Sequence, residues 1–516
     1  SSAAALSTKM IDFTALVSLF FVLLILKLVT GRYASPIRGQ RLPPGPWQLP
    51  LIGSLHHLLL SRSGGLPHRA MRDLSRAHGP LMLLRLGAVP TLIVSSAEAA
   101  REVMRTHDAA FASRHLSATL DIITCGGKGV LFSPYDDRWR ELRRVCVQEL
   151  FSQRRVLSFR PAREDEVARL LRAVSDGCRG GRAVNLGEKM CRMTTDSVVR
   201  AAIGERCDHR DEFLHELDVA VRLTGGINLA DLYPSSRLVR RLSVAARDMV
   251  KCQRNIYRIV QSIIRVRERA GAPEPERDED LLGVLLKLQK DGGLQFELTT
   301  EMITAVILDV FSAGSETTST TLEWAMSELM KNPRVLHKVQ SEVREAFKGK
   351  DKLTEEDIVK VRLGYLQLVI KEALRLHPPG PLLLPRECRE TCRVMGYDVP
   401  KGTKVVVNVW AMGRDHMYWG DAEAFRPERF ENSTIDFKGA DFEFLPFGAG
   451  RRMCPGMSLA MANMELSLAS LLFHFDWELP CGMRPEDMDM TETFGITARR
   501  KFKLSVHAKS HVPCGN

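Results

Sequence analysis

The stretch from Phe447 to Gly456 reads Phe-Gly-Ala-Gly-Arg-Arg-Met-Cys-Pro-Gly and places one cysteine, Cys454, in a glycine-rich turn. Pro455 follows it, and proline favours the first position of a helix because its missing N–H would have no partner there. The residues 456–475 contain no further proline and are rich in Leu, Ala and Met. Cys454 is therefore predicted just before a helix, where free N–H groups and the helix dipole stabilise a thiolate. Such a thiolate is a good ligand for a haem iron, whereas an ordinary cysteine is a small buried apolar side chain.

The same stretch resembles the haem-thiolate signature of cytochrome P450 enzymes, Phe-x-x-Gly-x-Arg-x-Cys-x-Gly. Its fixed positions are all filled, by Phe447, Gly450, Arg452, Cys454 and Gly456. The resemblance spans roughly residues 43 to 500 and is closest to the microsomal enzymes of plant specialised metabolism. It implies a mainly α fold with small β-sheets and haem b as the cofactor. It also implies that Cys454 is the iron ligand and that Phe447, Gly450 and Arg452 surround the haem.

Length and composition narrow the class of protein. The 516 residues exceed an ordinary domain, but no long linker divides them, and the resemblance implies one large domain over residues 47–516. The eleven cysteines are odd in number and form no Cys-x-x-Cys pair, so neither a disulfide framework nor a zinc site is indicated. The net charge of +11 favours an anionic membrane surface or an acidic partner protein. Nucleic acid is not an expected partner, because the charge is widely spread and no nucleic-acid motif is present.

The N-terminal segment is expected to anchor the chain in a membrane. The run 13–26 is apolar apart from Thr14 and Ser18, although its length also suits the core of a signal peptide. More basic residues follow this run than precede it, which favours a retained span with the following chain in the cytosol. Residues 1–30 are predicted as a single transmembrane helix and residues 31–46 as a basic, proline-rich hinge. The resemblance implies the endoplasmic reticulum membrane and a hinge that orients the catalytic domain against the lipid.

A stretch without proline from Thr299 to Asn332 predicts a long helix. Its middle, 313–321, reads Ala-Gly-Ser-Glu-Thr-Thr-Ser-Thr-Thr, and glycine with a cluster of hydroxyls weakens a helix interior. Packing of these residues against a neighbour is one explanation. The other is their resemblance to the oxygen-binding motif of the same family, Ala-Gly-x-(Asp/Glu)-Thr-Thr. That resemblance implies that Gly314 leaves room for dioxygen, that Glu316 relays protons, and that Thr317 donates a hydrogen bond to the oxygen.

Basic and aromatic residues far apart in the sequence are candidates for binding the haem carboxylates. Trp139 and Arg143 are four apart and share one face of a helix predicted over residues 136–151. An arginine-rich helix is ordinarily a solvated surface. The resemblance implies instead that both residues bind a haem propionate and that Arg386 and Arg452 are further donors. Indole and guanidinium groups only donate, which is what a buried carboxylate requires.

A Glu-x-x-Arg pair, Glu372 and Arg375, lies on a helix predicted to end near His377. Surface pairs of this spacing are common and contribute little to stability. The resemblance implies that this pair is buried, with Arg429 as its third member. Its role is then structural, since a buried glutamate between two arginines is costly to break and holds the haem-binding loop in shape.

Substrate contacts are expected in a loop over residues 114–134, on the long helix, after the Glu-x-x-Arg helix, and in a loop near the C-terminus. Apolar side chains in such places are equally well explained by ordinary packing. The expected contacts are Ile122, Leu131, Ala313, Leu383 and Phe494.

The activity implied is insertion of one oxygen atom from dioxygen into a C–H or C=C bond of an apolar small molecule, by hydroxylation or epoxidation. A plant defence terpenoid is favoured, and alkaloid or phenolic precursors stay open. No Gly-x-Gly-x-x-Gly fingerprint is present, so electrons are expected from a separate NADPH–cytochrome P450 reductase. The alternatives are an enzyme of the same fold that isomerises or dehydrates without dioxygen, and a non-catalytic haem protein.

Overall fold

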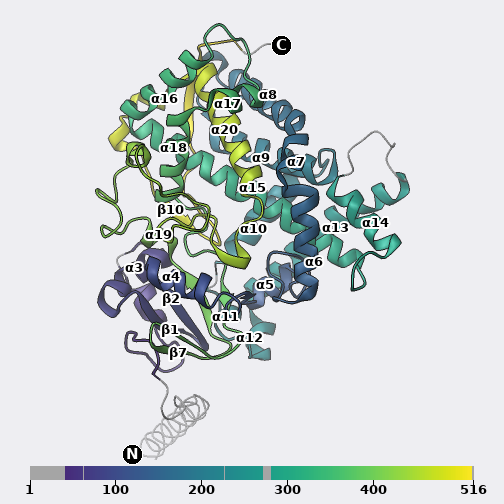
Figure 1. Ribbon diagram of the computed structural model, residues 1–516, viewed down its shortest axis with the longest axis vertical. Helices are drawn as coiled ribbons and strands as arrows, with labels where there is room; N and C mark the ends of the chain where they lie inside the picture. The colour runs from purple at the N-terminus through teal and green to yellow at the C-terminus, as the bar shows by residue number, and fades with distance from the viewer. Residues whose placement is uncertain (1–40, 62, 226, 271–279, 514–516) are drawn as a thin grey trace, which may run out of the picture.

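The computed structural model describes residues 41–513 apart from residues 62, 226 and 271–279. The anchor predicted at 1–30 and most of the hinge predicted at 31–46 lie outside these residues. Each helix in the described part of the chain is too short or too polar to cross a membrane. Figure 1 shows a mainly helical molecule with a small sheet at one end, which agrees with the predicted fold class.

Most of the described chain is helical, and the longer helices gather around α15 (Figure 1). These longer helices are α3 Pro67–His78, α6 Asp137–Cys146, α8 Arg160–Gly177, α9 Leu186–Ile203, α10 Arg210–Leu223, α13 Val244–Ala270, α14 Leu281–Asp291, α15 Thr300–Lys331, α16 Pro333–Ala346, α18 Gly364–Leu376 and α20 Met457–His474. Shorter helices are α2 Leu55–Leu59, α4 Ala97–Arg101, α5 Ala118–Ile123, α7 Gln153–Ser158, α11 Leu229–Leu232, α12 Arg237–Leu242, α17 Glu355–Val361 and α19 Val409–Met412.

The helix α15 confirms the long helix predicted from the sequence. Thr299 caps it, because its side chain accepts a hydrogen bond from the N–H of Met302 at 3.3 Å. Most of its side chains are buried, so neighbouring helices cover it on nearly all sides. A Cβ atom at Gly314 would lie 2.9 Å from Val198 of α9. Close approach of α9 therefore explains the glycine in the helix interior.

A five-stranded sheet in the order β1-β2-β8-β5-β3 lies beside the helices. Its edge strand β3 is antiparallel to the neighbouring strand β5, and the two pair Arg114 with Arg386. Side chains that lie directly opposite in such a pair point to the same face of the sheet, so this edge brings two arginines together. The strands of this sheet are β1 Leu81–Leu86, β2 Val89–Val94, β3 Ser113–Arg114, β5 Arg386–Glu387 and β8 Lys404–Val407. The smaller sheets consist of β4 Val184–Asn185, β9 Phe475–Glu478 and β12 Ser505–Ser510, of β6 Cys392–Val394 with β7 Tyr397–Val399, and of β10 Glu492–Phe494 with β11 Ala498–Arg500.

Two predicted elements differ in detail. The helix predicted over 136–151 consists of α6 and a following π-helical turn, Val147–Phe151. The region 114–134, expected to be a loop, contains the short helix α5. Ser117 caps α5 by accepting a hydrogen bond from Leu120 N–H at 3.4 Å, a local signal that the glycines later in the region obscured.

The end of the predicted hinge that the structure describes is packed against β1. Pro44 accepts a hydrogen bond from Leu83 N–H at 2.8 Å. A Cβ atom at Gly45 would lie 2.2 Å from the Leu83 carbonyl oxygen. Only glycine allows this close approach, so residues 43–46 follow the sheet as a fixed segment.

Candidate active site

A cavity of about 340 Å³ lies between α15, the loop before α20, α5, α10 and the sheet edge that carries Arg386. Most of the residues around it are apolar, and arginines, threonines and two carboxylates add polar groups to the wall. Predicted site residues from distant parts of the sequence meet here. Those that line the cavity are Leu131, Arg143, Ala313, Gly314, Glu316, Thr317, Leu383, Arg386, Phe447, Arg452 and Cys454.

Cys454 sits at the end of a tight loop whose shape depends on glycine. Its N–H donates to the carbonyl of Phe447 at 3.0 Å, which closes the loop. Gly450 has a φ of +70°, and a Cβ atom there would lie 2.3 Å from the carbonyl oxygen of Met104. The helix α20 begins at Met457, close to the predicted start, and the accessible surface of Cys454 faces the cavity. The loop therefore presents one thiol to the interior.

Burial and nearby polar groups act on the Cys454 thiol in opposite directions. Burial raises the pKa of this thiol, and the N–H of Gly456 and the charge of Arg143 only partly oppose that effect. The N–H of Gly456 thus acts in the direction predicted for a helix start, and burial opposes it in the protein without a cation at the sulfur. A metal ion at the sulfur deprotonates a coordinating thiol outright, so the donor set suits a thiolate bound to a cation.

Four arginines, Arg114, Arg143, Arg386 and Arg452, surround the side of the cavity next to Cys454. Burial, Arg386 and Arg143 lower the pKa of Arg452 to about 9. Burial and the three neighbouring guanidinium groups lower the pKa of Arg114 well below its usual value. Such a concentration of buried positive charge requires anions.

The described residues supply few anions to this cluster. Arg386 lies 3.4 Å from Asp108, while Arg114, Arg143 and Arg452 form no ion pair with a described carboxylate. Their guanidinium groups donate instead to main-chain carbonyls, as Arg143 does to Met453 at 2.6 Å and Arg452 to Ala112 at 2.6 Å. The two propionates of haem b match this cluster in charge and in acceptor chemistry, so the residues present fit the cofactor.

Trp139, predicted to bind a haem propionate, lies next to the arginine cluster. Its indole N–H donates to the carbonyl of Val130 at 2.9 Å, and the side chain lies outside the cavity wall. Its ring lies under two of the cavity arginines, with centroid distances of 4.0 Å to Arg452 and 5.4 Å to Arg143. Trp139 thus contacts the arginines that face the cavity.

Arg114 belongs to the cluster but was missed by the sequence reasoning. It donates to the carbonyls of Leu384 at 2.8 Å and Leu131 at 3.3 Å. Its strand β3 has two residues, too few for a sequence pattern, and its partner β5 is far away in the chain. A basic residue at the start of the glycine-rich region was the one available signal.

On α15, Thr317 lines the cavity, and its hydroxyl donates to the carbonyl of Ala313 at 2.7 Å. Glu316 also reaches the wall, and its Oε1 accepts from Thr497 Oγ1 at 2.7 Å and from Arg499. Arg499 in turn lies 2.6 Å from Asp218 of α10, whose side chain is 39% exposed. A chain of charged groups therefore connects the cavity wall to the surface.

The predicted substrate contacts are only partly placed at the cavity. Leu131, Ala313 and Leu383 line it. Ile122 faces away, towards a small cluster with Ala230 and Ala246, and its neighbour Ile123 lines the cavity instead. Phe494 borders a separate, smaller pocket, whereas Ile496 reaches the main one. Gly314 lines the cavity, and a side chain there would point towards Val198 of α9, so helix packing is a second reason for the glycine beside the predicted room for dioxygen.

The Glu-x-x-Arg pair and its third member are brought together and buried. Arg375 binds Glu372 through Nε at 2.7 Å and Nη2 at 2.8 Å, and Arg429 Nε binds Glu372 Oε1 at 2.9 Å. Next to Arg429, Phe430 contacts Phe444 with ring centroids 5.3 Å apart. The aromatic contacts continue through Phe437 to Phe447, at 6.2 and 5.4 Å. The buried charges therefore support the loop that ends at Cys454.

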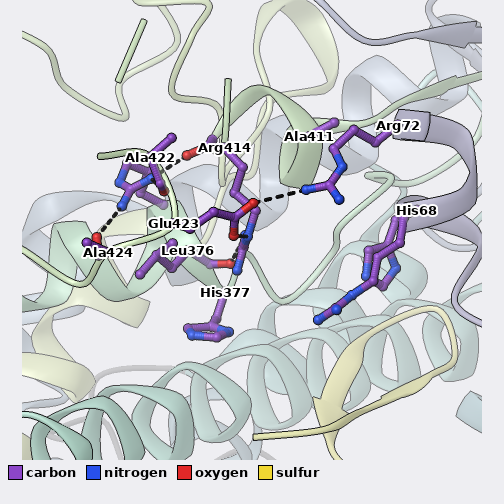
Figure 2. A network of polar contacts seen from close by, with 12 residues as sticks. His68, Arg72, Leu376, His377, Ala411, Arg414, Ala422, Glu423 and Ala424 are labelled. Carbon is purple, nitrogen blue, oxygen red and sulfur yellow. Dashed lines mark hydrogen bonds and ion pairs between the residues drawn. The ribbon is translucent and has the colours of Figure 1, made fainter. Parts of the chain in front are cut away.

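A second set of contacts extends this scaffold, as Figure 2 shows. Arg72 and Arg414 both point towards Glu423, at 3.0 and 3.1 Å. Arg414 also lies over the ring of Trp410, and burial lowers its pKa to about 10. Arg375 donates to the carbonyls of Ala422 at 2.7 Å and Ala424 at 3.0 Å, which flank Glu423. The network connects the segment 414–424, which precedes Phe430, to α18 and α3.

Comparisons with known proteins agree with this geometry. The family model described as "Cytochrome P450" matches residues 43–506. The dolabradiene monooxygenase of Zea mays is 51% identical over 470 residues, covering 91% of this chain and 92% of that protein. The ent-cassadiene hydroxylase of Oryza sativa subsp. japonica is 51% identical over 499 residues, covering 95% of each chain. A zebrafish cytochrome P450 solved with abiraterone superposes with a TM-score of 0.72 at 27% identity, covering 86% of this chain and 99% of that one.

The matched residues include the cysteine loop, the arginine cluster and α15, which together enclose one cavity suited to haem b. The chain belongs to the cytochrome P450 family and is a haem-dependent monooxygenase.

Proposed function

We propose that this enzyme hydroxylates or epoxidises a plant terpenoid hydrocarbon. The observation that carries the proposal is the wall of the cavity beyond Cys454, which is built mainly from aliphatic side chains such as Leu131, Val306 and Ile496. A flexible, largely apolar wall binds a hydrocarbon by burial of its surface, at about 25 cal/mol per Å². Relatives at 51% identity that are named for dolabradiene and ent-cassadiene support the same substrate class.

We assign the cofactor to residues of the cavity as follows. Cys454 holds the iron as a thiolate, and Arg114, Arg143, Arg386 and Arg452 hold the propionates, with Trp139 stacked behind two of them. Phe447 and the glycines of its loop lie against one side of the cofactor. When bound, haem b supplies the activation of dioxygen, with one oxygen atom going to the substrate and the other to water.

Thr317 and Glu316 are assigned to proton handling at the cavity wall. The hydroxyl proton of Thr317 is held on Ala313 O, and rotation of the side chain turns the hydroxyl towards the cavity. Thr497 and Arg499 fix Glu316 Oε1, and Arg499 joins it to the half-exposed Asp218. Because the Arg499 guanidinium stays protonated, it holds the Glu316 carboxylate in place, and that carboxylate is the group that we assign to passing protons to the wall.

The proposal is tested by offering terpene, fatty-acid and phenylpropanoid panels to membranes that contain the protein, reductase and NADPH. We expect oxygenated terpenes that carry one atom from labelled dioxygen, and no product when the reductase is omitted. The Thr317→Ala variant is expected to form product roughly 100-fold more slowly, because it lacks the hydroxyl donor. Thr304→Ala is the matched control, because Thr304 lies on the same helix, donates to Thr300 O at 2.7 Å in the same way and is not part of the cavity wall. Full activity of Thr317→Ala without reductase would instead favour an isomerase or dehydratase, and no turnover of any panel would favour a non-catalytic haem protein.

We further propose that residues 1–30 anchor the enzyme in the endoplasmic reticulum membrane, with residues 31–46 as hinge and the domain in the cytosol. Exposed apolar side chains near the packed end of the hinge support this proposal. Leu238 and Leu242 of α12 are both 67% exposed, and they alternate with arginines that suit anionic headgroups. Tyr233 bonds Leu51 O at 3.0 Å, so α11 and the first described residues share this side of the molecule.

For the membrane assignment, we expect the full chain to stay with microsomal membranes after an alkaline carbonate wash. Trypsin added outside sealed microsomes should digest the catalytic domain, because it faces the cytosol. Recovery of the protein in the carbonate supernatant, or protection of the domain from trypsin, would contradict the assignment.

A further inference from the structure

Two cysteines outside the active site, Cys388 and Cys392, lie with their sulfur atoms 4.0 Å apart. Cys388 directly follows β5, the strand that supplies Arg386, and Cys392 begins β6. The loop between them has three residues, 389–391, so the two thiols face each other across a short turn. This contact has no role in the cavity or in the scaffold of the Glu-x-x-Arg pair.

The backbone fixes both ends of this turn. Cys388 N–H donates to Thr403 O at 2.9 Å, and Gly402 N–H donates to Cys388 O at 2.7 Å. Cys392 pairs with Val399 in the β6–β7 hairpin, and Cys388 Sγ lies 3.6 Å from the Val399 carbonyl. The two sulfurs are thus held close by separate strands, and a small rotation of the side chains brings them within bonding reach.

The two thiols differ in accessibility and in acidity. Cys388 is fully buried, whereas Cys392 is half-buried. The contact between the two sulfur atoms lowers the pKa of Cys392, and the same contact together with burial raises the pKa of Cys388, whose thiol also donates to Glu390 O at 3.0 Å. Cys392 is therefore the sulfur that reacts first with a solute, and Cys388 is the sulfur placed to resolve the product.

Ordinary packing is the simplest alternative, because cysteine behaves as a small apolar side chain and Cys388 belongs to a buried cluster. Cytosolic thiols are also usually reduced. Packing alone, however, leaves unexplained why a buried thiol and a solvent-reachable one of lowered pKa are paired. Reversible cytosolic disulfides have this arrangement of an attackable and a resolving sulfur.

We propose that Cys388 and Cys392 are a peroxide-sensitive modification site that forms a reversible disulfide. The Cys392 thiolate attacks hydrogen peroxide and takes up one oxygen as sulfenic acid, and with one proton the other oxygen leaves as water. Cys388 then attacks the sulfenic sulfur, the S–S bond forms, and the hydroxyl leaves as a second water with the Cys388 proton. Two thiols are oxidised by two electrons and one peroxide is reduced; two equivalents of a small thiol reverse the reaction. The site is independent of the proposed substrate.

The test maps this bond in the full-length, haem-loaded protein. The protein is treated with a small excess of hydrogen peroxide, alkylated with iodoacetamide under denaturing conditions and digested with trypsin. Because trypsin cleaves after Arg386, Arg389 and Arg393, a disulfide joins the peptides 387–389 and 390–393. We expect this linked species to become the main form of both peptides after peroxide and to disappear with dithiothreitol.

Variants separate the two steps. Cys392→Ser is expected to abolish the linked species, and Cys388→Ser is expected to leave a sulfenic acid at Cys392 that dimedone captures. Cys481, which is exposed on the surface, is the internal control for unspecific oxidation. Recovery of both peptides alkylated at their untreated yield, or of Cys392 as sulfinic acid without linkage in the wild-type protein, would overturn the proposal. If Cys388→Ser does not fold, the presence or absence of the linked peptides in the peroxide-treated wild-type protein decides the question.

Discussion

Replacement of Cys454 by alanine is expected to reduce oxygenation to the level of a reaction without enzyme. The thiol is the group that the loop presents to the cavity. The described wall contains no imidazole, and its other sulfur atoms belong to the buried side chains of Cys146 on α6 and Met464 on α20. The four arginines remain, so the variant should still bind haem loosely through its carboxylates. Turnover and the ratio of haem to protein measure the two effects.

Two further variants make this prediction specific to the sulfur. Cys454→His is expected to retain haem, because imidazole is also an iron ligand, but not to oxygenate, because only the thiolate donates the electron density that favours O–O cleavage. Cys481→Ala changes an exposed cysteine and should leave both measurements unaltered. Normal turnover by Cys454→Ala would contradict the assignment of Cys454 as the iron ligand.

Replacement of Glu372 by glutamine is expected to cost about 3 to 5 kcal/mol of the free energy of unfolding. Its carboxylate is fully buried and accepts hydrogen bonds from Arg375, Arg429 and the N–H of Arg426. A neutral amide leaves two buried guanidinium charges without an anion. The aromatic contacts from Phe430 to Phe447 transmit the loss to the cysteine loop, so we expect poor haem retention as well.

The loss of stability is measured by denaturant unfolding, which is followed by the near-ultraviolet signal of the tryptophans and by haem absorbance. Glu431→Gln is the matched control, since Glu431 is 45% exposed and pairs with Lys338 at 3.2 Å. An exposed pair contributes about 0 to 1 kcal/mol, so this control should be nearly neutral. Equal stability of the Glu372 and Glu431 variants would show that the buried triad has no structural role.

The parts of the site that could be predicted from the sequence are those that depend on local patterns. The cysteine loop needs glycines where φ is positive, and α15 needs a cap and a long apolar stretch. Both requirements can be recognised in a continuous stretch of sequence. The meeting of Glu372, Arg375 and Arg429 was available only through the resemblance, because Arg429 comes from a distant segment.

The remaining features depend on tertiary contacts that a single sequence does not contain. Arg114 joins the arginine cluster because two short strands pair far across the chain. Ile122 and Ile123 are neighbours, and the rotation of a one-turn helix decides which of them faces the cavity. The effect of burial on the pKa of the Cys454 thiol could not be predicted for the same reason, since burial is known only from the fold.

The most direct test of the central claim is the absorption spectrum of the reduced, carbon-monoxide-treated full-length protein. A thiolate from Cys454 on the haem iron predicts the long-wavelength Soret band that is typical of thiolate-ligated haem, and predicts its loss in Cys454→His. A spectrum of the ordinary histidine-ligated type in the wild-type protein, unchanged by substitution of Cys454, would contradict the account.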